Sequence, residues 1–214
     1  MARSRLLAGI YEAHNRRRGR GFVYGGPERI AALRRFLPAN PGCVLDLGCR
    51  DGSLAEALGL EARRTVGVDI DIEALRLATN QARLRGVAAD LWGWLPFADD
   101  SVDLVVAGEI LEHLPFPEVL VSEAARVLVP TGTLLGSTPN ALRLKNRLRF
   151  ALGRDFEDDP THLRHFSAST LRSLLGRYFE RVVVVPCVGR LAWLSGPWLG
   201  NDIVFVAEGC DRSR

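Results

Sequence analysis

Three aspartates follow short apolar runs in the first half of the chain. Asp46, Asp69 and Asp90 each lie at or near the end of such a run, and Gly48 and Gly52 come soon after the first of them. The carboxyl ends of parallel strands meet at one edge of a sheet, so we expect the three acids to lie close together. An acid placed ahead of the glycines repels a pyrophosphate but suits an ammonium or a sulfonium. The sequence therefore predicts a site for a positively charged, adenosine-containing cofactor.

A second group of residues has the chemistry of an acid–base site. Glu109, Glu112 and His113 form the pattern E-x-x-E-H, which places all three on one face of a predicted helix. His162 and His165 follow a run of acidic residues further along the chain. We expect His113 and His162, with His165 as a further candidate, to converge near the reacting atoms. His113 and His162 would serve as catalytic residues, with one of them removing a proton.

Other interpretations of the same residues stay open at this stage. Two carboxylates and an imidazole also suit Mg²⁺, Mn²⁺ or Zn²⁺, and His162 would complete such a site. A histidine that only caps or packs a helix is the simplest alternative. We favour a site without a metal ion.

The elements that must position these residues alternate between strand and helix. Such alternation predicts an α/β fold, a Rossmann-like sheet of seven mostly parallel strands with helices on both faces. No helix is evident between the last two strands, so we expect a closing hairpin with the final strand antiparallel. The predicted strands are 43–47, 65–69, 87–90, 102–107, 134–137, 182–185 and 203–207, and the predicted helices are 27–37, 53–58, 71–85, 117–128 and 168–178.

Composition places further limits on the protein. The chain of 214 residues is 47% hydrophobic, which suits one domain with a substantial core, and no apolar run is long enough to span a bilayer. The start of the chain does not read as a secretory signal. The four cysteines have no paired spacing, which predicts reduced thiols and a cytoplasmic protein.

The net charge of +3 is unevenly distributed, because arginines cluster at residues 16–20 and 143–154. Clustered arginine can bind nucleic acid or phosphate. Aromatic residues are not interleaved with these arginines as single-strand binding favours, so nucleic acid is an alternative partner that we do not favour.

The chain resembles the class I S-adenosylmethionine-dependent methyltransferases from about Pro27 to Glu208. Asp46, Gly48 and Gly52 match three positions of the family pattern D-x-G-x-G-x-G, and the segment L-P-F-A-D-D-S-V-D at residues 95–103 matches the family's turn into the fourth strand. The resemblance implies the strand order 3-2-1-4-5-7-6 and S-adenosyl-L-methionine as the cofactor. It also implies the cofactor-binding residues Asp46, Gly48, Cys49, Gly52, Asp69, Ile70, Asp90, Leu91 and Glu109.

Within this resemblance Asp69 would bind the ribose hydroxyls, with Ile70 along the adenine, and Asp90 would accept the adenine amino group. Capping of the following helix is the structural alternative for Asp69. Arg50 stands where the family has its middle glycine. A positive φ there would cost on the order of 1 kcal/mol, and the side chain would point outward or pair with the cofactor carboxylate.

The expected organisation is a basic N-terminal arm or helix over residues 1–26 and a methyltransferase domain over residues 27–210, with a substrate-cap insertion at about 139–166. The loop 188–200 is apolar and carries Trp193 and Trp198. Apolar loop surface marks a binding site or an interface, so this loop predicts either an apolar acceptor pocket or a homodimer contact.

The predicted function is methyl transfer from S-adenosylmethionine to a small-molecule acceptor at oxygen, similar to the ubiquinone-pathway O-methyltransferases. Two alternatives remain. The arginine clusters and the E-x-x-E-H pattern would also suit an RNA methyltransferase, metal-assisted or not, and Arg50 in the glycine loop would suit an adenosyl-binding domain without catalysis.

Overall fold

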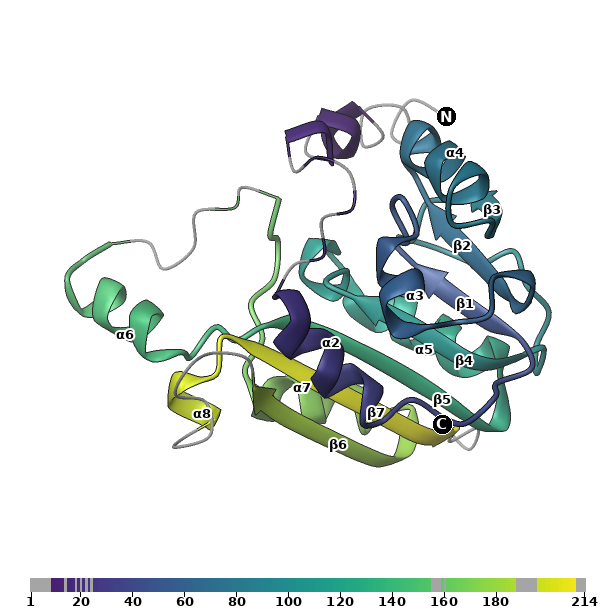
Figure 1. Cartoon of the computed structure of the whole chain (residues 1–214). Helices are drawn as coiled ribbons and strands as arrows, with labels where there is room; N and C mark the ends of the chain where they lie inside the picture. The colour runs from purple at the N-terminus through teal and green to yellow at the C-terminus, as the bar shows by residue number, and fades with distance from the viewer. Residues whose placement is uncertain are drawn as a thin grey trace.

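The computed structural model of the chain describes residues 9–13, 15–17, 19, 21, 23, 25–154, 159, 161–187 and 196–210. Seven strands form one sheet in the order β3-β2-β1-β4-β5-β7-β6 (Figure 1). The strands are β1 Val44–Leu47, β2 Thr65–Asp69, β3 Arg85–Ala88, β4 Val102–Gly108, β5 Leu128–Pro139, β6 Phe179–Cys187 and β7 Asp202–Cys210. β7 is antiparallel to both of its neighbours, and the remaining pairs are parallel. The expected strand order and the antiparallel final strand are therefore confirmed.

Helices cover both faces of this sheet. They are α2 Gly26–Arg34, α3 Ser53–Leu58, α4 Ile72–Asn80, α5 Pro117–Val127, α6 Leu144–Ala151, α7 Ala168–Leu175 and α8 Gly196–Leu199, with 3₁₀ turns η1 Ala62–Arg64 and η2 Leu111–His113. One apolar core joins the strands to α5 and α7, a second joins them to α2 and α3, and a third lies between α3 and α4. Among the described residues, no helix combines the length and the apolar composition that crossing a membrane requires.

The central strands explain why the apolar runs in the sequence were informative. β1 and β2 are buried along their whole length, because helices pack on both faces of a parallel sheet. Such strands read as continuous apolar runs, and Thr65–Asp69 occupies the predicted range. The carboxyl ends of β1, β2 and β4 then lie side by side, which places the residues that follow them at one edge.

Several expectations need correction. β3 ends at Ala88 rather than at Asp90, because it is an edge strand whose exposed residues carry no apolar signal. The helix expected at 71–85 ends at Asn80. Residues 109–113 do not form a helix: Glu109 has a φ of +57°, and a single 3₁₀ turn follows it. The insertion at 139–166 contains helix α6, and the last loop contains the short helix α8, neither of which the sequence pattern predicted.

Candidate active site

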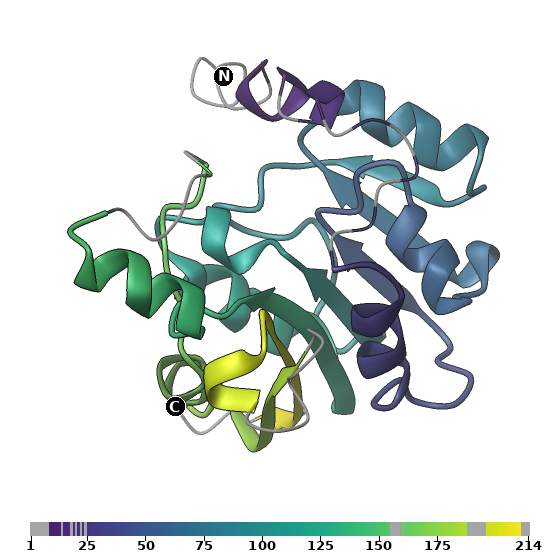
Figure 2. The same ribbon diagram turned by 60° about the vertical axis from the view of Figure 1, so that its left-hand side comes forward.

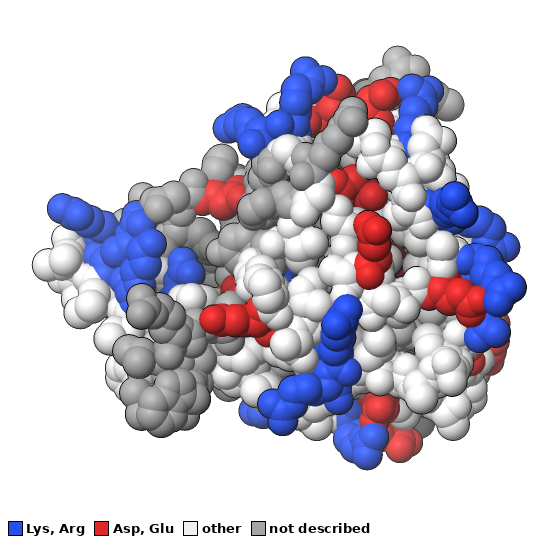
Figure 3. Space-filling view, in the orientation of Figure 1, with Lys and Arg blue, Asp and Glu red and all other residues white. Residues whose placement is uncertain are grey.

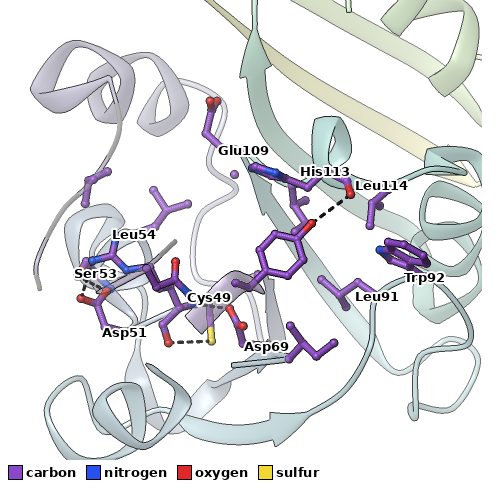
Figure 4. Close-up of a pocket in the computed structure, with 18 of the residues that line it drawn as sticks. Cys49, Asp51, Ser53, Leu54, Asp69, Leu91, Trp92, Glu109, His113 and Leu114 are labelled. Atoms are coloured by element: carbon purple, nitrogen blue, oxygen red, sulfur yellow. Dashed lines mark hydrogen bonds and ion pairs between the residues drawn. The ribbon is translucent and has the colours of Figure 1, made fainter. Parts of the chain in front are cut away.

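A cavity opens at the carboxyl ends of β1, β2 and β4. It has a volume of about 980 Å³, measured out to its open mouth, and lies between the glycine loop after β1 and the turn after β4. Figure 4 shows Cys49 and Asp69 on one side of it and His113 and Leu114 on the other. The cavity also takes residues from the N-terminal segment and from α2, so its walls come from parts of the chain that are distant in sequence.

The glycine loop needs its glycines for two different reasons. Gly48 has a φ of +71°, and a Cβ there would lie 2.9 Å from Cδ1 of Ile110, another residue of the cavity wall. Gly52 has a φ of +80° and precedes α3, and its Cβ would meet Cβ of Ala82 at 2.8 Å. Gly48 thus lets the backbone come close to Ile110 in the cavity wall. Gly52 does not line the cavity, and its positive φ instead permits the turn from the loop into α3.

Asp46 is buried beneath this loop, and its carboxylate is not fully hydrogen-bonded. Its side chain is 1% exposed, and Oδ2 has no hydrogen-bond partner in the part of the chain that the structure describes. Its pKa is raised to about 7, mainly by burial and next by nearby Asp69, and Arg29 opposes the increase. A buried carboxylate with an unpartnered oxygen is costly, and a nearby cationic ligand would offset that cost.

Asp69 lines the cavity at the end of β2. Its Oδ2 accepts a hydrogen bond from the backbone amide of Arg50 at 2.8 Å, and its Oδ1 accepts one from the amide of Asp71 at 2.8 Å. Burial raises the pKa of Asp69 to about 6, and these backbone hydrogen bonds oppose the increase. The cap of α4 is Asp71, which accepts from the amides of Glu73 and Ala74, so the capping alternative for Asp69 is wrong.

Arg50 adopts the left-handed conformation that its place in the glycine loop requires, with a φ of +51°. Its guanidinium contacts the carbonyl of Gly19 in the N-terminal segment and lies 3.3 Å from Oδ2 of Asp51. The same Asp51 oxygen accepts from the amide of Gly21 at 2.9 Å. Arg50 also lines the cavity, so its pairing with the cofactor carboxylate stays a prediction.

The described part of the N-terminal segment lies beside α4 (Figure 2). The Tyr11 hydroxyl donates to the carbonyl of His113 at 3.3 Å, and the Asn15 amide donates to Oδ2 of Asp71 at 2.9 Å. Tyr11 and Asn15 both line the cavity. Sequence reasoning missed them, because nothing local in a polar N-terminal helix indicates what that helix packs against.

Arg29 of α2 is a second residue that the sequence did not indicate. It is 3% exposed and lines the cavity. Its Nη1 lies 3.1 Å from Oε1 of Glu109 and donates to the Ser137 hydroxyl at 2.7 Å, which in turn donates to Glu109 at 2.9 Å. The pKa of nearby Asp202 is raised to about 7, mainly by burial and next by the charge of Glu109, whereas Arg29 opposes the increase. The only available signal was an arginine directly before a half-buried apolar residue, Ile30.

The residues expected to do acid–base chemistry come together in part. The rings of His113 and His162 lie 4.7 Å apart, centre to centre, at an interplanar angle of 75°. Glu112 is buried beside them and accepts a hydrogen bond from the Thr138 hydroxyl at 3.1 Å. The candidate ligand atoms of Glu112, His113 and His162 all lie within 4.8 Å of one another. The pKa of Glu112 is raised well above its usual value, mainly by burial and next by the charge of Glu109.

Two of the candidates lie apart from this group. Glu109 pairs with Arg29 and is not one of the three clustered residues. His165 is exposed and is not in the cluster either. The expectation that Glu109, Glu112 and His113 share one helical face is therefore wrong, because the positive φ of Glu109 and the 3₁₀ turn separate them.

The loop after β3 contributes apolar surface to the cavity. Leu91 and Trp92 line it, whereas Asp90 does not, and the Asp90 carboxylate accepts a hydrogen bond from the Trp92 amide at 2.9 Å. Ile70, after β2, lines the cavity as well. Ile70, Leu91 and Trp92 thus provide apolar walls of the kind that a purine ring requires.

The sheet order and a cavity of this kind define an α/β domain that binds an adenosine-containing cofactor. The model of a methyltransferase domain family matches residues 20–178. A probable S-adenosylmethionine-dependent methyltransferase of Mycobacterium tuberculosis is 38% identical over 133 residues, which cover 62% of this chain and 46% of that protein. A malonyl-[acyl-carrier protein] O-methyltransferase of Coxiella burnetii is 31% identical over 65% of this chain and 46% of its own.

Among solved structures, the fold is similar to an S-adenosylmethionine-dependent methyltransferase of Thermotoga maritima, described as a possible histamine N-methyltransferase. The TM-score is 0.69 at 20% identity, over 85% of this chain and 87% of that one. The chain spans about half the length of the curated relatives it matches. The chain belongs to the methyltransferase domain family, and S-adenosylmethionine is the cofactor for which the Mycobacterium tuberculosis relative is named.

The cavity fits this cofactor on its own geometry. The orphaned oxygen of buried Asp46 would supply negative potential to a sulfonium and an ammonium bound in the cavity. Gly48 leaves the space that a Cβ would fill, and Asp69 presents carboxylate oxygens at the wall.

Proposed function

We propose that the protein transfers a methyl group from S-adenosylmethionine to a small-molecule acceptor, at oxygen. The observation that carries this proposal is the convergence of His113 and His162 beside buried Glu112, next to a cavity that fits the cofactor. Methylation of a hydroxyl requires removal of its proton, and this cluster supplies imidazole nitrogens that can accept it. Relatives named as O-methyltransferases support the choice of oxygen.

The proposed cofactor-binding residues remain the nine expected from the sequence, with roles adjusted to the structure. The carboxylate of Asp69 would bind the ribose, and Ile70 and Leu91 would enclose the adenine. Asp46 and Gly52 do not line the cavity. Asp46 would act on the cofactor through its charge, and Gly52 through the conformation that it gives to the loop. The full proposed set is Asp46, Gly48, Cys49, Gly52, Asp69, Ile70, Asp90, Leu91 and Glu109.

The residues around the acceptor would orient it and move its proton. His113 Nδ1 lies 3.1 Å from the carbonyl of Thr161. A carbonyl only accepts hydrogen bonds, so this contact assigns the Nδ1 proton to His113 and leaves the lone pair on Nε2. That tautomer is the one a general base needs. The cofactor supplies the electrophilic methyl group when bound, and the protein aligns the acceptor oxygen with it.

The same cluster leaves a metal-assisted version as a second candidate. Glu112, His113 and His162 offer three ligand atoms within 4.8 Å of one another, which is the carboxylate and imidazole set that Zn²⁺ or Mn²⁺ accepts. We favour the metal-free version, because Glu109, which would have completed the set, is paired with Arg29 instead.

The test is turnover of radiolabelled S-adenosylmethionine with a panel of hydroxyl, amine and RNA acceptors. We expect transfer to a hydroxyl compound, unchanged by a chelator, and loss of turnover in His113→Ala and His162→Ala with cofactor affinity retained. Transfer to RNA only would favour the RNA methyltransferase. Tight cofactor binding without transfer to any acceptor would favour a non-catalytic domain.

The organisation of the chain is part of this proposal. Residues 27–210 would form the catalytic domain, residues 1–26 an arm over the cofactor, and residues 139–166 a cap that carries His162. We propose a cytoplasmic location, which four unpaired cysteines support.

The apolar acceptor or the homodimer contact expected at the loop 188–200 stays a prediction. Trp193 lies outside the described residues. Trp198 is 48% exposed, with the Arg147 guanidinium 3.8 Å from the centre of its ring.

A further inference from the structure

Helix α6 projects from the body of the protein. In two views that differ by 60°, it extends away from the sheet and from the helices that cover it (Figures 1 and 2). Specific hydrogen bonds among the described residues hold its base. Asn146 is 3% exposed and donates to the carbonyl of Ala141 at 3.2 Å, and Ala141 donates from its backbone amide to the carbonyl of Phe166. One side of α6 therefore faces the protein, and the other side faces outward.

The outward side of α6 is apolar. Leu144, Leu148, Ala151 and Leu152 recur at the spacing of one helical face. Leu144 is 39% exposed, Leu148 is 56% exposed and Leu152 is 72% exposed. Phe150 on another side of the helix is also exposed. Large aliphatic side chains gathered on a projecting helix indicate that something covers them.

Basic side chains flank this apolar face. The stretch from Leu142 to Arg154 contains five basic residues and no acidic residue: Arg143, Lys145, Arg147, Arg149 and Arg154. Figure 3 shows the blue side chains of this projection gathered at one end of the molecule. Arg147 is held in place, because its Nε donates to the carbonyl of Leu142 at 2.7 Å and its guanidinium stacks over Trp198.

We propose that α6 docks on an anionic lipid surface, with Leu144, Leu148 and Leu152 inserted among the acyl chains and the basic residues at the headgroups. A helix with an apolar face and a basic flank is the pattern of proteins that bind in the plane of a bilayer. The positive charge matches the negative charge of such a surface. The inference stands on the helix alone and does not depend on the proposed methyl transfer.

Two other occupants suit this surface less well. A second copy of the chain would bring five basic residues against the same five, which opposes a symmetric contact. Single-stranded nucleic acid needs aromatic platforms for its bases, whereas α6 exposes leucines and one phenylalanine. The four acidic residues among 155–159 reduce the attraction at longer range, so we expect reversible docking that depends strongly on salt.

The position of α6 in the chain connects the surface to the candidate active site. The same insertion, residues 139–166, carries α6 and His162, and the parallel bridge between Asn140 and Phe166 closes its base. Docking through α6 would therefore hold the His162 loop close to the lipid surface.

The experiment is co-sedimentation of the full chain with vesicles of phosphatidylcholine alone or of equal parts phosphatidylcholine and phosphatidylglycerol. We expect binding to the anionic vesicles only, reduced by added salt. Leu148→Ser with Leu152→Ser, and Lys145→Glu with Arg154→Glu, should each weaken it by at least about tenfold. All four positions are exposed, so these variants should fold.

The matched controls are Ile72→Ser and Arg63→Glu, which change equally exposed residues elsewhere and should bind as the unaltered protein does. Several results would overturn the proposal: no binding to either vesicle, equal binding to both, or equal effects of the α6 and control variants. A dimer in solution that the leucine variant dissociates, or retention of a single-stranded RNA without vesicle binding, would assign the surface to those partners instead.

Discussion

The replacement Asp46→Asn tests whether this buried carboxylate is held ready for a cation. Asp46 lies beneath the glycine loop, almost fully buried, with one oxygen unpartnered among the described residues. Asparagine has nearly the same shape but carries no charge. The substitution therefore removes the charge and leaves the packing around it intact.

The expected effect on stability depends on pH. The Asp46 carboxyl has a pKa of about 7 in the folded protein against 3.8 ordinarily, because burial disfavours its charged form. Between pH 4 and 7 the unfolded chain has lost this proton and the folded protein keeps it, so stability falls as pH rises. Above pH 7 the loss of stability levels off at roughly 4 kcal/mol. The pKa of Asp46 differs by about three units between the unfolded and folded chain, and each unit corresponds to ~1.4 kcal/mol.

The asparagine variant escapes this loss but buries an amide. An unsatisfied buried N–H group costs about 1–3 kcal/mol. At pH 8 we therefore expect Asp46→Asn to be more stable than the unaltered protein by about 1–3 kcal/mol, which is a rise in Tm of roughly 2–12 °C for a chain of this size. At pH 4.5 the gain should vanish or reverse, because little of the charge penalty remains there.

The measurement is thermal unfolding of the cofactor-free protein at pH 4.5 and pH 8, followed by circular dichroism. Asp51→Asn is the control. Burial alone would raise the pKa of Asp51, but hydrogen bonds from Ser53 and Gly21 lower it below its ordinary value. That carboxylate stabilises the fold above its unfolded pKa and loses this effect as pH falls, so Asp51→Asn should destabilise at pH 8.

The same variant should bind the cofactor more weakly. If the Asp46 charge offsets those of the sulfonium and ammonium, calorimetric titration at pH 8 should show at least a tenfold loss of affinity, about 1.4 kcal/mol. A Tm difference independent of pH would refute the argument from buried charge. Unchanged affinity would refute the pairing of Asp46 with the cofactor, even if the stability result held.

The other expectations for the site concern its cofactor, its base and its covering segment. Asp69→Ala should lower cofactor affinity at least tenfold, because charge-assisted hydrogen bonds are worth roughly 1.5–3 kcal/mol each; an unchanged titration would remove Asp69 from the site. His113→Ala and His162→Ala should each lower kcat by roughly 10²–10⁴-fold with cofactor Kd retained and no effect of chelator; inhibition by chelator would favour the metal-assisted version. Arg50→Gly should change the free energy of unfolding by only about 1 kcal/mol, because relief of the positive φ offsets lost contacts. It should nevertheless speed proteolysis near Gly19, and an unchanged cleavage rate would mean that Arg50 does not hold the segment.

The features predicted correctly from the sequence depend on local patterns. The glycine loop and the two central strands are specified by runs that are buried on both faces, so their ranges are visible without knowledge of the rest of the fold. The edge strand β3 gave a weaker signal, because exposed strand residues need not be apolar. Its predicted position was shifted by two residues, which moved Asp90 from a strand end into a loop.

The features that were missed depend on contacts between distant segments. Arg29 is buried because Glu109 and Ser137, about 80 and 108 positions later, meet it across the sheet edge. Tyr11 reaches the cavity through a hydrogen bond to His113. The helical face expected at 109–113 failed for a different reason. A spacing of three and four residues predicts a shared face only if the backbone is helical, and Glu109 is not.

Arg50 shows how these two kinds of information combine. In sequence it breaks the glycine pattern, which predicts backbone strain and a bulky side chain that either points outward or pairs with the cofactor carboxylate. The structure has the positive φ, at +51°, and the Arg50 guanidinium contacts the carbonyl of Gly19 and the carboxylate of Asp51. Strain on the order of 1 kcal/mol is matched by charge-assisted hydrogen bonds of similar size. The departure from the motif therefore makes physical sense only together with the N-terminal segment, which the motif does not include and which lies over the cavity.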